Sequence, residues 1–318
     1  VGPVTQVLEM LQILRVPQSL TAGRTARLPL AAQFVPIPIT TVLRVTRGVP
    51  RVDVDVSLLN GAHDHRLRVH FPTGIVTDEA FFDGHFEVIR RSITLPSESQ
   101  AAGWAERPVH EQPQQGFVTV LGDETGLTVA SRGLPEVAVL AHPHYGTEIA
   151  LTLLRSVGWL RRHDLACRRH EMEMPVEAPG AQCPGDYTFH YSLIPHGADP
   201  LPAWHAAWAY QTPLHALATG IHRGILPPVA GLVTVDNPAF VLSAVKTAAE
   251  GKGLIIRGYN ISEEPAPVIL TLGVPARVAD LTRLDETPTG ERVKPAQDGT
   301  FRFEAGPHQI VTLKFATD

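Results

Sequence analysis

The fold class is decided by residues 41–59, which read TVLRVTRGVPRVDVDVSLL. Valine and leucine alternate there with arginine, threonine, aspartate and serine, and this period of two is typical of a β-strand with one buried face. Gly48, Val49 and Pro50 interrupt the alternation and indicate a turn. The stretch therefore predicts two strands joined at residues 48–50.

Further segments with the same period lie between glycine, proline or polar turns along the chain. The predicted strands among them are 66–71, 86–95, 116–121, 127–131, 138–141, 149–156, 187–194, 240–246, 254–260, 267–272 and 310–315. A single helix is predicted, at 203–209, and Pro213 follows its end. Many short strands without intervening helices favour sandwich layers over a parallel α/β sheet.

The distribution of prolines suggests how the strands are grouped. Three prolines fall within residues 227–238, together with turn-forming polar residues. We therefore expect an all-β fold in which a large antiparallel β-sandwich, residues 1–235, is followed by a smaller C-terminal β-sandwich, residues 236–318. The larger one resembles the mutarotase-like supersandwich, and whether its first strands lie within this sequence is left open.

Composition and charge argue against several classes of function. The 318 residues carry a formal net charge of -5, whereas nucleic-acid-binding proteins usually have a clustered basic face. No apolar run approaches the ~18 residues of a membrane-spanning helix, and no secretory signal segment is present. We expect no nucleic-acid partner and no membrane partner. The sequence is expected to be a piece of a longer protein, and Cys167 and Cys183 are expected to be free thiols.

Two histidine pairs raise the question of a metal site. His63 and His65 flank Asp64, and His142 and His144 flank a proline. A zinc centre needs a third or fourth ligand from elsewhere in the chain, and helical zinc motifs are absent from the sequence. A polar turn is the favoured interpretation of the first pair and a solvated loop that of the second, so no metal ligand is predicted.

Two acidic pairs are candidates for glycosidase chemistry, Asp83 with Glu87 and Glu106 with Glu111. Such chemistry needs two carboxylates about 5 Å apart, or roughly 6.5–9.5 Å apart with a water between them. Nothing around these residues specifies convergence, and we expect exposed acids at strand edges and in loops. The Gly-x-Ser-x-Gly, P-loop and Gly-x-Gly-x-x-Gly motifs are absent from the sequence as well. No catalytic residue is predicted.

Two tryptophans could form a platform for a sugar. Trp204 and Trp208 lie four residues apart, so they share one face of the predicted helix, with Tyr210 nearby. If exposed, their rings would stack on the apolar faces of pyranose rings. The favoured interpretation is a helix that packs against the core, and the sugar platform is the alternative.

One basic residue stands out in the apolar segment 153–160, which reads LLRSVGWL. The apolar neighbours of Trp159 predict burial, which makes Arg155 unusual. An arginine in such a strand usually has a carboxylate partner or faces a cleft. From the residues alone both interpretations remain, and the structural ion pair is the preferred one.

Five sequence motifs, in the expected order along the chain, resemble bacterial α-mannosidases of glycoside hydrolase family 38. They are DHRLRV with FP at 64–72, RPVH with PQQGFV at 107–118, IALTLLRSVGWL at 149–160, PGAQCPG with YTF at 179–189, and NP with VLSAVK, LIIR and YN at 237–260. The third motif is the most specific. Together they span essentially the whole chain, although the sequence departs from the family around residues 142–146 and 170–175.

The resemblance implies a C-terminal β-sandwich region that follows an α/β catalytic domain and a helical bundle. It implies a zinc-dependent retaining α-mannosidase whose zinc ligands and catalytic aspartates lie mainly in that catalytic domain, so no catalytic residue, metal ligand or cofactor is assigned to this chain. The expected partners are the catalytic domain of the same polypeptide and a mannose-containing glycan. In the family the β region lends an arginine to the sugar site, and the matching motif position assigns this substrate-binding role to Arg155.

Three functions remain open, and the first is favoured. The chain is expected to scaffold the catalytic domain and complete its glycan-binding cleft, to be inactive alone, and, from its bacterial motifs and missing signal segment, to be cytoplasmic. The first alternative is an independent carbohydrate-binding module built on Trp204 and Trp208. The second is a mutarotase-like sugar epimerase, in which His65, His110 and Glu111 would transfer protons.

Overall fold

The computed structural model describes residues 2–20, 33–162, 167–168, 174–221, 223–224 and 227–316. Strands dominate these residues, and the paired strands run antiparallel. The described part contains one α-helix, α1 (Leu201–Gln211), and one 3-10 helix, η1 (Pro179–Gln182). The predicted all-β class is confirmed, and the predicted helix is present. Within the described part, no helix is both long and apolar enough to cross a membrane.

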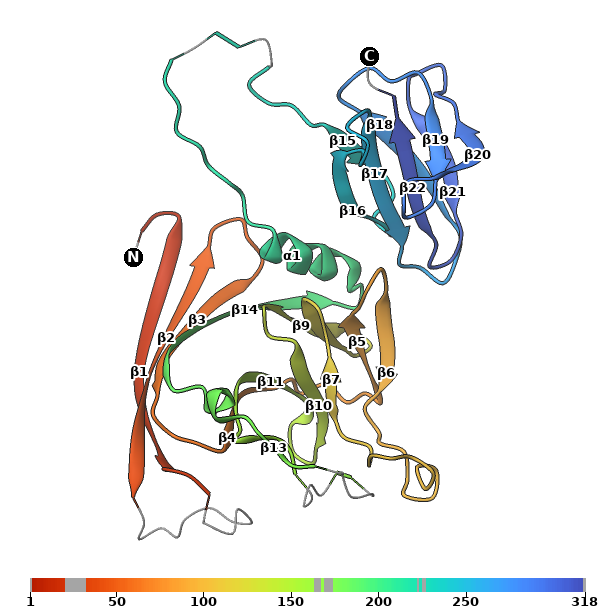
Figure 1. Ribbon diagram of the computed structural model, residues 1–318. Helices are drawn as coiled ribbons and strands as arrows, with labels where there is room; N and C mark the ends of the chain where they lie inside the picture. Colours follow the sequence, from red (N-terminus) through yellow and green to blue (C-terminus); the bar gives the residue numbers. More distant parts are fainter. Residues whose placement is uncertain are drawn as a thin grey trace. The chain divides into compact units, whose positions relative to one another are not determined.

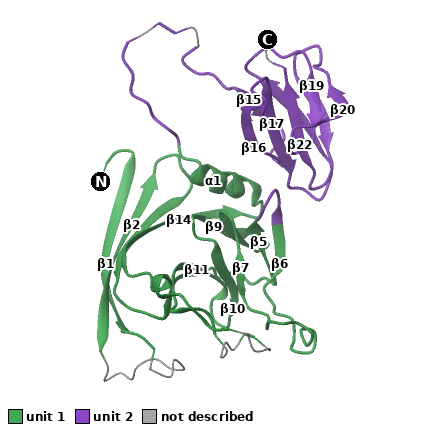
Figure 2. Cartoon of the chain, in the orientation of Figure 1, with its two compact units in different colours: residues 1–83, 89–213 green, residues 84–88, 214–318 purple. Residues whose placement is uncertain are grey.

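The chain divides into two compact units (Figure 2). The first holds residues 1–83 and 89–213, and the second holds residues 84–88 and 214–318. The boundary between independently folding domains, expected after residue 235, stays a prediction.

An eight-stranded sheet forms the larger layer of the first unit (Figure 1). Its strands, in spatial order, are β1 (Thr5–Pro17), β2 (Phe34–Thr46), β3 (Val52–Asn60), β14 (Gly185–Gly197), β9 (Thr125–Arg132), β8 (Phe117–Leu121), β5 (Glu79–Asp83) and β6 (Val88–Ser92). The two strands predicted from residues 41–59 are β2 and β3, with Val42 opposite Asp55 and Val45 opposite Val52. The alternation in the sequence therefore corresponds to a paired hairpin.

A four-stranded sheet forms the second layer of the first unit. Its order is β4 (His65–Pro72), β11 (Gly146–Ser156), β10 (Glu136–His142) and β7 (Glu111–Pro113). β11 is an inner strand of this sheet, and its residues 147–154 are all buried. Apolar side chains of both sheets form one core, among them Val54, Val56, Phe82, Val118, Val129, Val137, Ile149 and Leu151. The two layers make the predicted large β-sandwich.

Several elements of the first unit differ from the predicted strands. The strand expected at 86–95 is shorter in the structure and is β6, residues 88–92. Phe86 cannot belong to it, because its φ of 60° lies outside the extended region. β1 is absent from the predicted strands, since its apolar residues do not alternate. A short pair, β12 (Trp159–Arg161) with β13 (Val176–Glu177), lies outside both large sheets.

The second unit is a smaller sandwich of two sheets. One sheet holds β15 (Val233–Val235), β18 (Ala266–Leu272) and β21 (Phe301–Ala305). The other holds β16 (Phe240–Thr247), β17 (Leu254–Asn260), β22 (Ile310–Phe315), β19 (Ala279–Thr282) and β20 (Pro288–Val293). Phe301 and Phe315, one from each sheet, meet edge to face in its core, with their ring centroids 5.0 Å apart. The predicted smaller C-terminal sandwich is confirmed.

Candidate functional site

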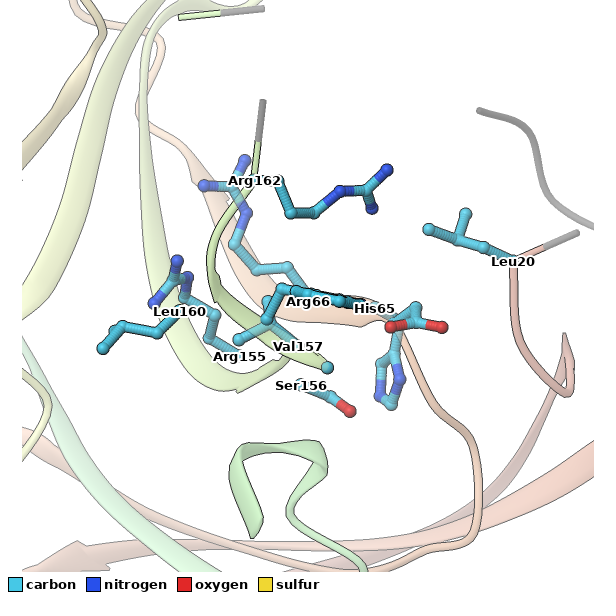
Figure 3. A pocket seen from close by; sticks show the side chains of 11 residues that line it. Leu20, His65, Arg66, Arg155, Ser156, Val157, Leu160 and Arg162 are labelled. Atoms are coloured by element: carbon cyan, nitrogen blue, oxygen red, sulfur yellow. The ribbon is translucent and has the colours of Figure 1, made fainter. Parts of the chain in front are cut away.

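A cavity of about 380 Å³ lies in the first unit, where β11 ends and the chain turns into β12 (Figure 3). Its walls come from Leu20, residues 64–66, residues 155–160 and Arg162. Arg155, the predicted substrate-binding residue, therefore lines a cavity, together with His65 and Trp159. This cavity is the candidate site.

The backbone of β11 sets the position of Arg155. Next to β4 the register shifts between Thr152 and Leu154, so that Leu153 has no residue opposite it. Such a β-bulge bends the strand and re-aims the side chains that follow it. As a result Arg155 lies opposite Arg66 and is exposed, whereas the eight residues before it are buried.

The charge of Arg155 has no counterpart in the part of the chain that the structure describes, where the arginine makes no ion pair. Its cross-strand neighbour Arg66 differs, because the guanidinium of Arg66 lies 2.8 Å from Glu111 and 3.5 Å from Glu136. The structural ion pair preferred for Arg155 from the sequence is thus not found among the described residues. The guanidinium offers unused donors, which suit hydroxyl or carboxylate oxygens of a ligand.

Glu111 is held ionised by two arginines of β4. Burial alone would raise its pKa, but hydrogen bonds from Arg68 and Arg66 outweigh burial and lower the pKa of Glu111 to about 2. The carboxylate therefore carries no proton to donate near neutral pH. Glu111 is a structural partner of the arginines and a poor candidate for proton transfer.

A glutamine braces the cavity from the side of η1. Gln182 accepts a hydrogen bond from the backbone amide of Asp64 at 2.9 Å and donates one to the Asp64 carboxylate at 2.8 Å. The hydroxyl of Ser156 donates to the side-chain oxygen of Gln182 at 2.9 Å. Gly158 leaves room for this arrangement, because a Cβ there would lie 2.7 Å from the side-chain nitrogen of Gln182. Neither Gln182 nor Ser156 is among the predicted site residues, and only the PGAQCPG and IALTLLRSVGWL motifs pointed to their segments.

Trp204 and Trp208 pack against the protein, which is the arrangement favoured from the sequence over a sugar platform. Both indoles are half-buried and contact the ring of Phe117. The Nε1–H of Trp204 donates to Oγ1 of Thr119 at 3.0 Å, and that of Trp208 donates to Oδ1 of Asp83 at 3.2 Å. With their polar ends bonded inside the protein, the two rings are not arranged as an open sugar platform.

Three of the four candidate carboxylates, those of Asp83, Glu106 and Glu111, make local contacts. Asp83 is only 5% exposed, so the expectation of an exposed acid is wrong for this residue, which is the buried acceptor for the indole of Trp208. Glu87 is half-buried. Glu106 is exposed and lies 2.7 Å from Arg168.

The residues of the mutarotase alternative are not gathered in one cavity. His65 lines the cavity of Arg155, His110 lines a different cavity, and Glu111 is bonded to arginines. His63 lies in the loop before β4, and His144 lies in the turn between β10 and β11. Among the described residues, no three His, Cys, Asp or Glu side chains are grouped so that they could hold a metal ion.

The burial predicted around Trp159 is wrong in part. Trp159 is half-buried and Leu160 is 70% exposed. The chain leaves the four-stranded sheet after Ser156, and β12 then pairs only with the short β13. Cys167 and Cys183 are free and half-buried, as predicted.

Two family models match the chain. Residues 12–163 match the C-terminal domain of the family 38 glycosyl hydrolases. Residues 239–313 match the C-terminal beta sandwich domain of the same family. The second match lies wholly within the second compact unit.

Relatives and solved structures point to the same family. A protein of Halalkalibacterium halodurans, named provisionally as a mannosylglycerate hydrolase, is 29% identical over 281 residues, which are 88% of this chain and 28% of that protein. An alpha-mannosidase from Enterococcus faecalis V583 has a crystal structure that matches with a TM-score of 0.81 at 28% identity, over 99% of this chain and 34% of that one. A crystal structure of a glycosyl hydrolase family 38 protein from Enterococcus faecalis gives a TM-score of 0.78 at 28% identity, over 99% of this chain and 35% of that one.

The chain spans roughly a third of the length of these relatives. The matched family models, the sandwich pair and the order of the sequence motifs agree with one another. This chain belongs to glycoside hydrolase family 38, as its C-terminal β-sandwich region.

Proposed function

We propose that this chain is the non-catalytic C-terminal part of a zinc-dependent retaining α-mannosidase. In this proposal the β-sandwiches scaffold the catalytic domain of the same polypeptide, and Arg155 completes the cleft that binds a mannose-containing glycan. The chain alone does not hydrolyse mannosides. The α-mannosidase named among the similar structures supports the substrate class.

The position of Arg155 is the observation that carries the proposal. The residue follows a bulge at the end of a buried strand, lines a cavity and has no carboxylate partner among the described residues. An arginine used only for stability would be expected to pair with an acid, as Arg66 does with Glu111. An arginine kept for a ligand needs free donors at a cavity wall, and Arg155 has them.

The exposed face of β1 supports the scaffolding role. β1 is the edge strand of the eight-stranded sheet, and its side chains are exposed on both faces, with Leu11 76% and Ile13 68% exposed. An edge strand of this length with exposed apolar side chains is normally covered by another part of the protein. The catalytic domain of the same polypeptide is the proposed cover.

Zinc, which the family implies, is not assigned to this chain. The described residues offer no group of three ligands, so they do not fit a zinc site of three or four protein ligands. In the proposal the zinc belongs to the catalytic domain, and no step of the reaction is assigned to the residues of this chain.

The test is Arg155→Ala in the polypeptide that includes the catalytic domain. Loss of a charged hydrogen-bond donor to the sugar is expected to lower kcat/KM for an aryl α-mannoside by about 10- to 100-fold. The matched control is Arg161→Ala, which removes the same charge from an exposed residue outside the cavity. Equal activity of the Arg155→Ala variant and the wild type would contradict the proposed role.

The second candidate substrate for the same site is a mannoside whose aglycone carries a carboxylate. The free guanidinium of Arg155 suits a carboxylate as well as a hydroxyl group, and one relative is named for hydrolysis of mannosylglycerate. The two substrates are distinguished by comparing an anionic and a neutral mannoside in the wild type and in Arg155→Ala. A loss confined to the anionic mannoside assigns Arg155 to the aglycone, and an equal loss for both assigns it to the sugar.

A further inference from the structure

A second cavity of about 600 Å³ lies at the turn between β10 and β11 in the first unit. Its walls come from residues 76–78, residues 93–95, His110 and the hairpin residues 140–143 and 146–147. It shares no lining residue with the cavity of Arg155. The proposed function makes no use of it, although it includes His142 of the histidine pair noted in the sequence.

Three polar side chains of this cavity have unused hydrogen-bonding groups. In the described part of the chain, neither the carboxylate of Asp78 nor the imidazole of His110 has a hydrogen-bond or ion-pair partner. Nδ1 of His142 accepts a hydrogen bond from the backbone amide of His144 at 3.2 Å. In its neutral form His142 therefore carries its proton on Nε2, which has no partner in the same described part. The cavity thus offers one strong acceptor and imidazole nitrogens that can donate.

The walls around these groups are fixed by the fold. The amide of Gly74 donates to the carbonyl of Tyr145 at 2.9 Å, and the amide of Ile93 donates to the carbonyl of Asp78 at 2.9 Å. Gly146 has a φ of 70°, and an added Cβ would collide with the carbonyl oxygen of Ile75. The close approach of the two segments therefore requires glycine at this position.

The ring of His142 is braced by a second aromatic side chain. It stacks on Tyr145 with 4.7 Å between ring centroids and 28° between ring planes. Apolar side chains, including Ile93, Leu140 and Pro143, form other parts of the wall. Apolar walls with a few convergent polar groups, at this volume, are typical of small-molecule sites. A pyranose ring matches this pattern, because it has apolar C–H faces and an edge of hydroxyl groups.

We propose that this cavity is a second carbohydrate-binding site, for a neutral pyranoside. The carboxylate of Asp78 accepts hydrogen bonds from sugar hydroxyls, the imidazoles of His142 and His110 donate to others, and the apolar wall covers a ring face. Asp78 is the one acidic or basic residue besides the histidines in this lining, so phosphorylated or carboxylated sugars are disfavoured by repulsion when the imidazoles are neutral.

The test is an NMR titration of the chain with methyl α-mannoside and then with a mannobiose, observing backbone amides. Shifts are expected at residues 76–78, 93–95 and 140–147. Asp78→Asn is expected to weaken binding about tenfold or more, since it replaces the ionised acceptor by a neutral one. Asp123→Asn, at an exposed residue outside the cavity, makes the same change and is expected to leave the affinity unchanged.

His142→Ala is an independent variant, and amide shifts far from the cavity report whether each variant keeps its fold. No shift at any sugar concentration up to the solubility limit would overturn the proposal. Shifts confined to residues around Arg155, or binding that survives both variants, would overturn it as well. Binding only of a phosphorylated sugar would contradict the neutral class. The proposed role of Arg155 is tested separately, by hydrolysis in the longer polypeptide, so failure of this second site leaves that role standing.

Discussion

Arg66 and Arg155 lie opposite each other in β4 and β11, and like charges in this position repel. Glu111 and Glu136 pair with Arg66 and offset its charge. The charge of Arg155 has no acidic partner among the residues that the structure describes. The two glutamates therefore reduce the repulsion between Arg66 and Arg155, although neither of them pairs with Arg155. A ligand oxygen bound by Arg155 would supply the missing partner, which is why we assign Arg155 to the glycan cleft.

The pairs made by Glu111 predict a pH-dependent contribution to stability. Because the pKa of Glu111 in the folded chain is about 2, below the ordinary 4.5, the ionised form stabilises the fold above pH 4.5. This contribution is lost as the pH falls from 4.5 towards 2. Glu111→Gln is therefore expected to lower the free energy of unfolding at pH 7 by up to about 1 kcal/mol, since the pairs are partly exposed and screened.

Urea unfolding of the wild type and of Glu111→Gln, at several pH values between 7 and about 2, measures this difference. The two curves are expected to converge at the acid end. Glu124→Gln is the matched control for loss of a charge, because Glu124 is exposed and takes no part in the ion pairs of Glu111. A difference that stays constant over the whole pH range would contradict the account of Glu111.

The direction of Arg155 could not be predicted from the residue pattern. Without the bulge at Leu153, continued pairing would place Leu154 opposite Arg66 and Arg155 opposite His65. Alternation assigns each side chain to one of two faces and contains no sign of an extra residue. The sequence therefore showed that this arginine is unusual, and the bulge explains why it is exposed.

Packing between elements is tight in the second unit, where β16 and β17 meet. A Cβ on Gly258 would collide with the ring of Phe240 and would lie 2.8 Å from the carbonyl oxygen of Val241. Gly258→Ala is therefore expected to destabilise this sandwich by about 1–3 kcal/mol, because the ring and the strand must both move. Thermal unfolding followed by circular dichroism measures the effect.

Gly103→Ala is the control for that variant, because an added Cβ there meets nothing within 4 Å. It is expected to leave the transition unchanged or to raise it slightly, since alanine restricts the unfolded chain more than glycine. Equal stability of the two variants would show that the packing around Phe240 is looser than described.

The alternation in residues 41–59 made β2 and β3 predictable, whereas β1 and β12 were missed. β2 and β3 alternate because one face of each contributes to the core. β1 has apolar residues on both faces, and both faces are exposed, so its pattern has no period of two. β12 is too short for any periodicity.

At the scale of the whole chain, the exposed face of β1 predicts self-association. Apolar side chains on an unpaired edge invite pairing with another copy when nothing covers them. We expect the isolated chain to form concentration-dependent dimers or larger species in sedimentation velocity. Leu11→Lys should reduce this association, because it places a charge at the most exposed leucine of the strand.

Val109→Lys is the matched control, since Val109 is 43% exposed and lies outside β1. It is expected to leave association unchanged. A chain that sediments as a monomer at all concentrations would contradict the need for a cover on β1.

The grouping of strands into two sandwiches was predictable. The hydrogen bonds that hold the walls of the Arg155 cavity together were not. Gln182 and Asp64 are 118 positions apart in the sequence, and their contact depends on how β4 and η1 are brought together. No local pattern contains that information. The family resemblance pointed to both segments, and the hydrogen bonds explain what the residues do there.

The most direct test of the account is hydrolysis of an aryl α-mannoside by this chain alone, with zinc present and then with a chelator. We predict no turnover under either condition, because no catalytic residue or metal ligand set is assigned to the chain. Turnover with zinc that the chelator abolishes would contradict the central claim, since the histidines of this chain would then hold the metal and its own residues would carry out the reaction.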